Sequence, residues 1–181
     1  MKRGIVVDIK RQHLWTLDDG RICREAAVST AINGPGEQQG SGCTPRGWHE
    51  ICERIGEGCP INTVFVGRRP TGEIYTPELA VAHPERDWVL TRILWLSGLD
   101  EGRNQGGEVD SRQRYVYIHG CPDELPLGVP LSHGCIRMHS AELMDLFVWT
   151  RLGERVLIVE DIEQVADSEI REALLQRRTA G

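Results

Sequence analysis

The sequence predicts a mainly β fold, a curved or sandwiched sheet system followed by two late helices. Before position 139, apolar residues fall in short runs rich in β-branched and aromatic side chains, which is typical of strands. Glycine, proline and aspartate separate these runs, as in chains with many tight turns. Apolar residues at helical spacing are clearest after Ser140. Together these patterns favour a β-rich α+β class.

Three strands are predicted before residue 31, at residues 4–10, 12–17 and 21–30. Asp18-Asp19-Gly20 is a strong hairpin signal between the second and the third. Residues 31–47 are rich in glycine and poor in apolar side chains, so they are predicted to form a long loop. A loop of this length in a compact domain is usually functional or disordered.

The middle of the chain is predicted to extend the sheet, with strands at residues 48–55, 63–68, 73–76 and 87–96. A turn is expected at Pro70-Thr71-Gly72. The strand at 87–96 is favoured by its β-branched and aromatic content, although its apolar residues fit neither period cleanly. Residues 98–107 are polar and contain several glycines, which predicts a mobile surface segment and a candidate lid.

A further strand is expected at residues 114–118, where it delivers His119 at its end, and another at 155–159. One helix is predicted from an N-cap at Ser140 to about residue 152, with Gly153 as its stop. A second, amphipathic helix is expected at about 162–178. The side chains predicted to face inward are Leu143, Leu146, Phe147 and Thr150 or Trp149 in the first helix, and Ile170, Leu174 and Leu175 in the second.

Length and charge limit the classes of function. The 181 residues fit a single domain, with a core at about 4–160. The net charge of −6 argues against a general affinity for nucleic acid or anionic membranes. The N-terminus has only three consecutive aliphatic residues before Asp8, and no apolar run is long enough to insert into a membrane. We therefore expect a cytoplasmic protein whose six cysteines are free thiols.

The residues that carry chemistry gather in one stretch, where His-Gly-Cys occurs twice, fourteen positions apart. A cysteine nucleophile needs a neighbouring base, because a free thiol is mostly protonated near neutral pH. For Cys135 the candidate bases are His119 and His133, and spacing alone does not choose between them. The other cysteines, Cys23, Cys43, Cys52, Cys59 and Cys121, are expected to be inert, and His13, His49 and His83 to be ordinary polar or core residues.

Three neighbours of Cys135 are further candidate site residues. Ser132 is predicted to orient a histidine or bind substrate, or else to cap a local turn. The amides near Gly134 and Cys135 are candidates for an oxyanion hole. Arg137 is predicted either to bind a substrate carboxylate or to be a surface arginine paired with Asp145 or Glu142.

The competing chemistry is a zinc site. Five residues in the stretch are zinc ligand types: His119, Cys121, His133, Cys135 and His139. Against zinc, neither His-x-Cys pair has the Cys-x₂₋₄-Cys spacing of structural zinc sites, and ligands one residue apart leave a tight bite.

Two motifs resemble the L,D-transpeptidase catalytic domain family. Residues 132–137, Ser-His-Gly-Cys-Ile-Arg, preceded by His119, resemble the family signature. Residues 40–47 resemble its Gly-Ser-x-x-Thr-Pro-x-Gly turn, so the similarity covers about residues 4–160. The chain departs from the pattern in a slightly short segment between His119 and Ser132, and in Arg137, which stands where part of the family has asparagine.

The resemblance implies a β-rich fold, Cys135 as nucleophile, His119 as base and His133 as a residue that shapes the site. It implies no cofactor and no metal. The expected substrate is a peptidoglycan stem tetrapeptide or muropeptide, cut between meso-diaminopimelate and the terminal D-alanine through a thioester, and carbapenem-type inhibitors are expected to bind. A cytoplasmic location favours water as acceptor, an L,D-carboxypeptidase in muropeptide recycling. The alternatives are a cross-linking transpeptidase and a fragment sensor without turnover.

Overall fold

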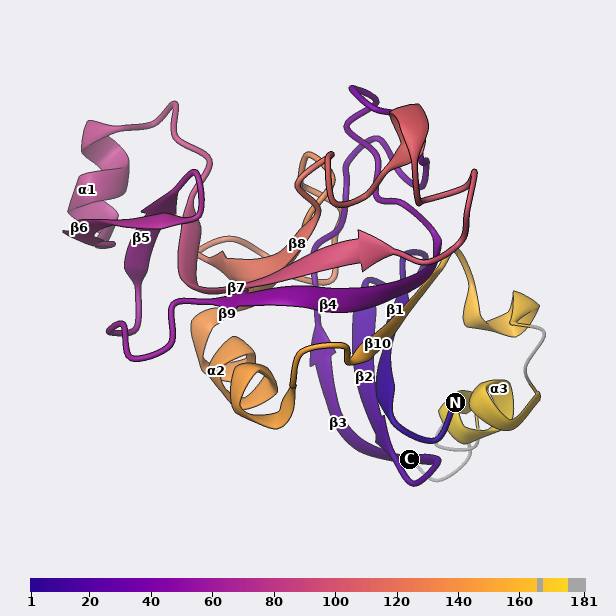
Figure 1. The fold of residues 1–181 in the computed structure, drawn as a ribbon. Coiled ribbons are helices and arrows are strands. Elements are labelled where there is room, and N and C mark those ends of the chain that lie inside the picture. Colours follow the sequence, from indigo (N-terminus) through magenta and orange to yellow (C-terminus); the bar gives the residue numbers. More distant parts are fainter. Residues whose placement is uncertain (166–167, 176–181) are drawn as a thin grey trace.

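The structure is a computed structural model that describes residues 1–165 and 168–175. Within this part, ten strands form one curved sheet (Figure 1). The strands are β1 Gly4–Asp8, β2 His13–Asp18, β3 Arg21–Ala27, β4 Gly47–Ile55, β5 Thr63–Val66, β6 Arg69–Ile74, β7 Val89–Gly98, β8 Tyr117–Cys121, β9 Ile136–His139 and β10 Arg155–Val159. The helices are α1 Pro77–Ala82, α2 Ser140–Trp149 and α3 Ser168–Leu175, with 3₁₀ turns at η1 Gly107–Val109 and η2 Ile162–Gln164.

The sheet runs in the order β3-β2-β1-β10-β4-β7-β5-β6, and β8 pairs with both β7 and β9. Three strands therefore pair with β7: β4 with residues 93–98, β5 with residues 89–90, and β8 with residues between 90 and 95. The β8–β9 pair is parallel, so the chain between them must cross back before β9 starts. The first His-Gly-Cys motif ends β8, and the second lies at the end of the crossover, directly before β9.

The two faces near β8 and β9 have different roles. Side chains alternate between faces along a strand, and Ile118 and Ile136 point into the main apolar core. Helix α2 covers that core through Leu143, Leu146 and Phe147, which are buried as predicted. The opposite face carries Tyr117, which packs in a separate apolar cluster. That second face holds the site described below.

Most predicted strands are confirmed, and so are the hairpin at Asp19-Gly20 and the long loop before β4. The predicted turn at residues 70–72 is wrong. The chain turns instead at Gly67 and Arg68, whose positive φ angles of 54° and 66° are those of a two-residue hairpin loop. Pro70 lies within β6, at the edge of the sheet, where a missing N–H costs no ladder bond.

Helix α1 was not predicted, although its start has a clear local signal. Thr76 Oγ1 accepts a hydrogen bond from the Leu79 amide, and Pro77 occupies the first helical position. The helix is six residues long and contains no buried residue. Leu79 and Ala80 are only partly buried, so this short helix lacks the repeated buried apolar positions that are used to predict helices.

Two predictions about α2 and the strand before it need correction. Ser140 is the first helical residue and not the N-cap, which is His139. Its hydroxyl pairs with Thr91 Oγ1 and Asn62 Oδ1, so tertiary partners replace the capping bond. His139 itself provides no capping side chain. His119 lies in the middle of β8 and not at a strand end, because Tyr115 has a φ of 57° and the strand starts only at Tyr117.

The segment 98–107, predicted to be mobile surface, is anchored by hydrogen bonds at one buried residue. Asn104 is fully buried, accepts from the Asp100 amide and donates to the Arg46 and Trp48 carbonyls. A Cβ at Gly98 would come within 1.9 Å of the Asn104 carbonyl oxygen, so the chain packs tightly there. The segment is therefore anchored at Asn104, and its role as a lid stays a prediction.

The predicted terminal helix starts later than expected. Residues Ile162–Gln164 form the 3₁₀ turn η2, and the α-helix starts at Ser168. Ile170 and Leu174 are buried as predicted, whereas the Leu175 side chain and residues 176–178 lie outside the described part. No helix among the described residues has both the length and the apolarity that a membrane span requires.

Candidate active site

The sheet register brings the predicted nucleophile and base to one face. In the parallel β8–β9 pair, Ile118 faces Ile136 and His119 faces Arg137. Cys135 directly precedes β9, so continuing the register places it beside Tyr117. Because side chains alternate, Cys135 and His119 share a face with Tyr117 and Arg137. Sequence spacing could not show this shared face, since it depends on how β8 and β9 pair.

Cys135 is half-buried against the apolar cluster that contains Trp95 and Tyr117. Its Sγ lies 3.5 Å from the carbonyl oxygen of Tyr115. Burial raises the pKa of the Cys135 thiol to about 11, and this outweighs the lowering effect of the Tyr117 backbone amide. The resting thiol is therefore protonated near neutral pH and needs a base in order to react.

His119 is 2% exposed, and its Nδ1 lies 2.9 Å from the carbonyl oxygen of Gly120. A carbonyl oxygen only accepts, so Nδ1 carries the proton and Nε2 keeps a free lone pair. Burial lowers the pKa of His119 to about 4, although the Gly120 carbonyl and Asp87 act in the opposite direction. The ring is thus neutral at pH 7 and able to accept a proton.

The turn that carries the nucleophile is closed by Ser132. Its Oγ donates to the Cys135 carbonyl at 2.5 Å and accepts from the Gly134 amide at 3.2 Å. This is the local-cap interpretation of Ser132, and the hydroxyl is already used within the turn. The Gly134 amide is likewise engaged, which argues against its predicted role as an oxyanion donor. Gly134 has a φ of 134°, a conformation that favours glycine.

Thr44, which sequence reasoning passed over as part of a turn motif, braces this same turn. Its Oγ1 donates to the Gly134 carbonyl at 3.0 Å and accepts from the Ala31 amide at 3.0 Å. Thr44 is fully buried. A buried hydrogen bond from Thr44 to Gly134 therefore joins the motif at residues 40–47 to the motif at residues 132–137.

We expect Thr44→Val to lower the free energy of unfolding by about 1–3 kcal/mol, because valine keeps the shape but leaves the Gly134 carbonyl and the Ala31 amide unpaired in the interior. Chemical denaturation measures the loss. Thr44→Ser keeps the hydroxyl and is the matched control, with a smaller loss. Equal stability of the valine and serine variants would contradict the bracing role.

Asp87 joins the two other predicted site residues. Its carboxylate accepts from Arg137 Nη2 at 2.7 Å and lies 3.2 Å from His133 Nδ1. The predicted partners of Arg137, Asp145 and Glu142, are therefore wrong. Arg137 is 6% exposed and also donates to the Leu131 carbonyl, so its guanidinium is largely engaged. The side chain of His133 is 75% exposed and lies at the protein surface.

Arg114 also anchors the site and was not predicted to do so. Its guanidinium donates to the carbonyl oxygens of Glu37 at 2.6 Å and Cys43 at 2.7 Å, and thus holds the long loop before β4. These partners are neutral, so a half-buried positive charge stays beside the site. It acts on the Cys135 thiol in the direction that lowers its pKa.

The five candidate zinc ligands are spread apart by the strand geometry. His133 is exposed to solvent, and His139 Nε2 forms a hydrogen bond of 3.0 Å with the Leu125 carbonyl. Cys121 is 1% exposed, and burial raises its pKa to about 12. No group of three or more His, Cys, Asp or Glu side chains within residues 1–165 and 168–175 is arranged to hold a metal ion.

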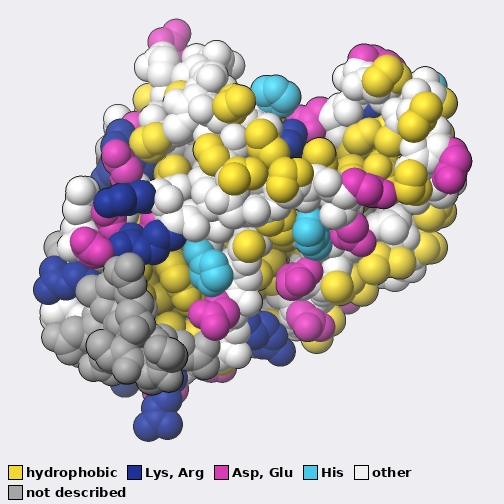
Figure 2. All heavy atoms as spheres, turned by 180° about the vertical axis from the view of Figure 1, so that it is seen from behind, with side chains coloured by type: hydrophobic (Ala, Val, Ile, Leu, Met, Phe, Trp, Pro, Cys, Tyr) yellow, Lys and Arg dark blue, Asp and Glu magenta, His cyan; other side chains and the backbone are white. Residues whose placement is uncertain are grey.

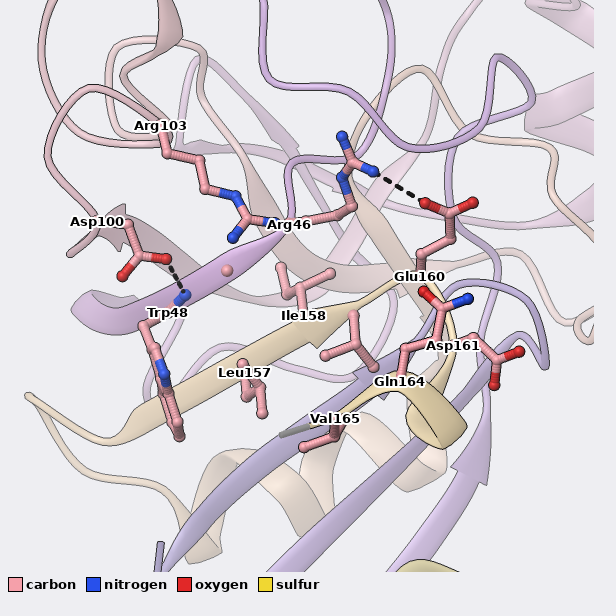
Figure 3. A pocket seen from close by; sticks show the side chains of 12 residues that line it. Arg46, Trp48, Asp100, Arg103, Leu157, Ile158, Glu160, Asp161, Gln164 and Val165 are labelled. Atoms are coloured by element: carbon pink, nitrogen blue, oxygen red, sulfur yellow. Dashed lines mark hydrogen bonds and ion pairs between the residues drawn. The ribbon is translucent and has the colours of Figure 1, made fainter. Parts of the chain in front are cut away.

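A cavity of about 480 Å³ lies away from these residues, between the segment around Asp100 and the η2 turn (Figure 3). Leu157, Val165 and Trp48 line its apolar part, while Arg46 points towards Glu160 and pairs with it at 2.9 Å. None of the predicted catalytic residues lines this cavity.

Comparisons with known proteins agree with the fold and the motifs. A family model, YkuD, the L,D-transpeptidase catalytic domain, matches residues 2–158. A stretch of 48 residues is 46% identical to "Putative L,D-transpeptidase YqjB" of Bacillus subtilis (strain 168) and covers 26% of this chain and 27% of that protein.

Solved structures are similar as well. A crystal structure of an L,D-transpeptidase from Enterococcus faecium is 17% identical, with a TM-score of 0.54 over 88% of this chain and 50% of that one. The catalytic domain of an E. faecium L,D-transpeptidase acylated by ertapenem is 20% identical, with a TM-score of 0.51 over 88% of this chain and 98% of that domain. The chain thus spans about a quarter of the curated relative and half of the first of these structures.

Proposed function

Since the chain belongs to the L,D-transpeptidase catalytic domain family, we propose that it cleaves peptidoglycan stem tetrapeptides through a thioester on Cys135, with water as the final acceptor. The observation that carries this proposal is the shared sheet face of Cys135 and the neutral His119, whose Nε2 is free to take a proton. The bond cut is the one between meso-diaminopimelate and the terminal D-alanine.

The first half-reaction forms the thioester. Cys135 Sγ attacks the carbonyl carbon that follows the L-centre of the diamino acid while its proton passes to Nε2 of His119. The tetrahedral intermediate then collapses, the carbon–nitrogen bond breaks, and His119 returns the proton to the leaving D-alanine amine. Because the resting pair is a thiol and a neutral imidazole, the proton moves during the attack and not before it.

The second half-reaction restores the enzyme. A water molecule gives a proton to His119 and attacks the thioester carbonyl. The carbon–sulfur bond then breaks, and the proton returns from His119 to the sulfur. The products are the tripeptide acid, D-alanine and free Cys135.

The charges around the thiol support water over an amine as acceptor. Arg68, Arg112 and Arg114 lie near Trp95, Tyr115 or Cys135. The nearby carboxylate of Asp87 is engaged by Arg137 and His133. An amine acceptor arrives as an ammonium, and these nearby arginines oppose its approach, whereas water is unaffected. Cross-linking to a second stem remains the alternative outcome.

Product analysis tests this proposal. We expect the purified protein to convert a disaccharide tetrapeptide to the tripeptide and D-alanine, as resolved by mass spectrometry. Added amine acceptors should leave the tripeptide the main product. Cross-linked dimers as the main product would show that the protein is a transpeptidase and not a hydrolase. An unchanged tetrapeptide with intact Cys135 would contradict both activities. A carbapenem adduct on Cys135 is expected independently of the acceptor.

A further inference from the structure

Arg68 places a cation on the ring of Tyr115, whose backbone contacts the nucleophile, and no step of the proposed reaction assigns this arginine a role. It lies in the turn between β5 and β6, and its guanidinium carbon is 4.4 Å from the ring centre of Trp95 and 5.0 Å from that of Tyr115. Its Nη1 donates to the hydroxyl of Tyr117 at 3.1 Å. Three aromatic side chains therefore fix the position of one guanidinium.

The same tyrosines contact Cys135. The Tyr115 carbonyl oxygen lies 3.5 Å from Cys135 Sγ, and Tyr117 packs in the apolar cluster against which Cys135 lies. Tyr115 thus touches the nucleophile with its backbone and Arg68 with its ring. Tyr115 therefore links the nucleophile to the guanidinium within one residue.

Within the described part of the chain, Arg68 and Arg114 hydrogen-bond to neutral partners, unlike several other arginines. Arg46, Arg86 and Arg137 each form an ion pair with a carboxylate. The hydrogen bond recorded for Arg68 within the described part of the chain goes to the neutral Tyr117 hydroxyl. A guanidinium has five N–H donors, so most of its donors are available to a ligand. The planar fork suits a carboxylate.

The backbone also supports a functional role. Arg68 has a φ of 66°, a left-handed conformation that costs a side-chain-bearing residue free energy and is more usual for asparagine or glycine. Figure 1 shows the β5–β6 hairpin in the lobe that carries α1, and Figure 2 shows the surface hollowed between this lobe and the rest. The turn of this hairpin places Arg68 on the rings of Trp95 and Tyr115.

We propose that Arg68, positioned by Trp95, Tyr115 and Tyr117, is a specificity-determining residue that binds a carboxylate of the acyl donor. This rests on the proposed function, in which the donor is a tetrapeptide. Two carboxylates of that donor lie near the cleaved bond: the terminal carboxylate of D-alanine and the side-chain carboxylate of diaminopimelate. Both offer the same chemistry to the guanidinium.

Three substrates and two variants test the proposal. The substrates are the tetrapeptide, its D-alanine carboxamide and its diaminopimelate side-chain carboxamide. Arg68→Asn removes the cation while suiting the left-handed turn. Arg69→Asn is the matched control, since Arg69 is an exposed neighbour in the same hairpin. Circular dichroism and thermal melting check that both variants fold as the wild type does.

For the wild type we expect kcat/KM on one of the two carboxamides to be about 10- to 100-fold lower than on the unmodified tetrapeptide, mainly because KM rises. A loss of this size corresponds to one hydrogen bond to a charged group. That carboxamide identifies the bound carboxylate. Arg68→Asn should lose a similar factor on the unmodified tetrapeptide and no longer distinguish it from that carboxamide, whereas Arg69→Asn should behave as wild type.

Several results would overturn the subsite while leaving the proposed function in place. These are equal use of all three substrates by the wild type, retained discrimination in Arg68→Asn, and an equal loss on every substrate in that variant. Failure of the wild type to process any of the three would overturn the proposed function, and the subsite with it.

Discussion

Replacing Cys135 by alanine is expected to reduce tetrapeptide turnover by a factor of about 10⁴ or more. In the proposed reaction the sulfur forms the covalent intermediate, and removal of a nucleophile typically costs factors of this order. The loss should fall on kcat, since substrate still reaches the aromatic and cationic surroundings of the site. Steady-state kinetics measure it, and intact-mass analysis should show no acyl-enzyme or carbapenem adduct.

Cys52→Ala is the matched control. Cys52 is also half-buried, packs against the same apolar cluster as Cys135, and has a thiol pKa raised by burial. Removing it tests the effect of losing a thiol from this cluster without touching the proposed chemistry. We expect activity within about threefold of wild type for Cys52→Ala. Turnover above a tenth of wild type in Cys135→Ala would rule out the thioester mechanism.

Local sequence signals predicted the elements well where the same residues decide the structure. The hairpin at Asp19-Gly20 follows from backbone preferences of those two residues, and the buried face of α2 follows from the spacing of Leu143, Leu146 and Phe147. Ser140 shows the limit. Its capping signal is genuine, but Thr91 and Asn62 compete for the hydroxyl, and both are distant in sequence.

The supports of the site were missed for the same reason. Thr44 and Gly134 are ninety positions apart, and Arg114 and Cys43 are seventy-one apart. Periodicity and motif spacing carry no information about such pairs. Asp87 stood at the start of a predicted strand with nothing to mark it as the partner of Arg137.

The two His-Gly-Cys copies have the same sequence, but the fold places them differently. The first lies within β8, so His119 and Cys121 are both buried in a strand. The second lies in the turn before β9, where His133 is exposed and Cys135 turns towards the apolar cluster. Sequence alone left two candidate bases. We favour His119, because the strand register places it on the face that carries Cys135 and its Nε2 is free, whereas the side chain of His133 is 75% exposed to solvent.

Acid is expected to destabilise the protein before its carboxylates titrate. Two buried histidines, His49 and His119, have pKa values that burial lowers from 6.5 to about 4. Between these values the unfolded chain binds protons that the folded chain excludes, so stability is full above about pH 6.5 and falls as the pH drops towards 4. At pH 5 the loss is about 2 kcal/mol for each histidine, or about 4 kcal/mol together.

Urea unfolding at pH 7.5 and pH 5 measures this difference. His49 pairs with Ser111 Oγ and the Gly47 carbonyl, in contacts separate from those of His119, so the two effects should add. We therefore expect His49→Gln and His119→Gln each to halve the pH-dependent change, whatever their effect on stability at pH 7.5. His133→Gln, at an exposed position, should leave the change intact. An unaltered pH dependence in both core variants would mean that other groups cause the acid loss. If His49→Gln alone keeps the wild-type change in stability between pH 7.5 and pH 5, the ring of His49 can be protonated without unfolding.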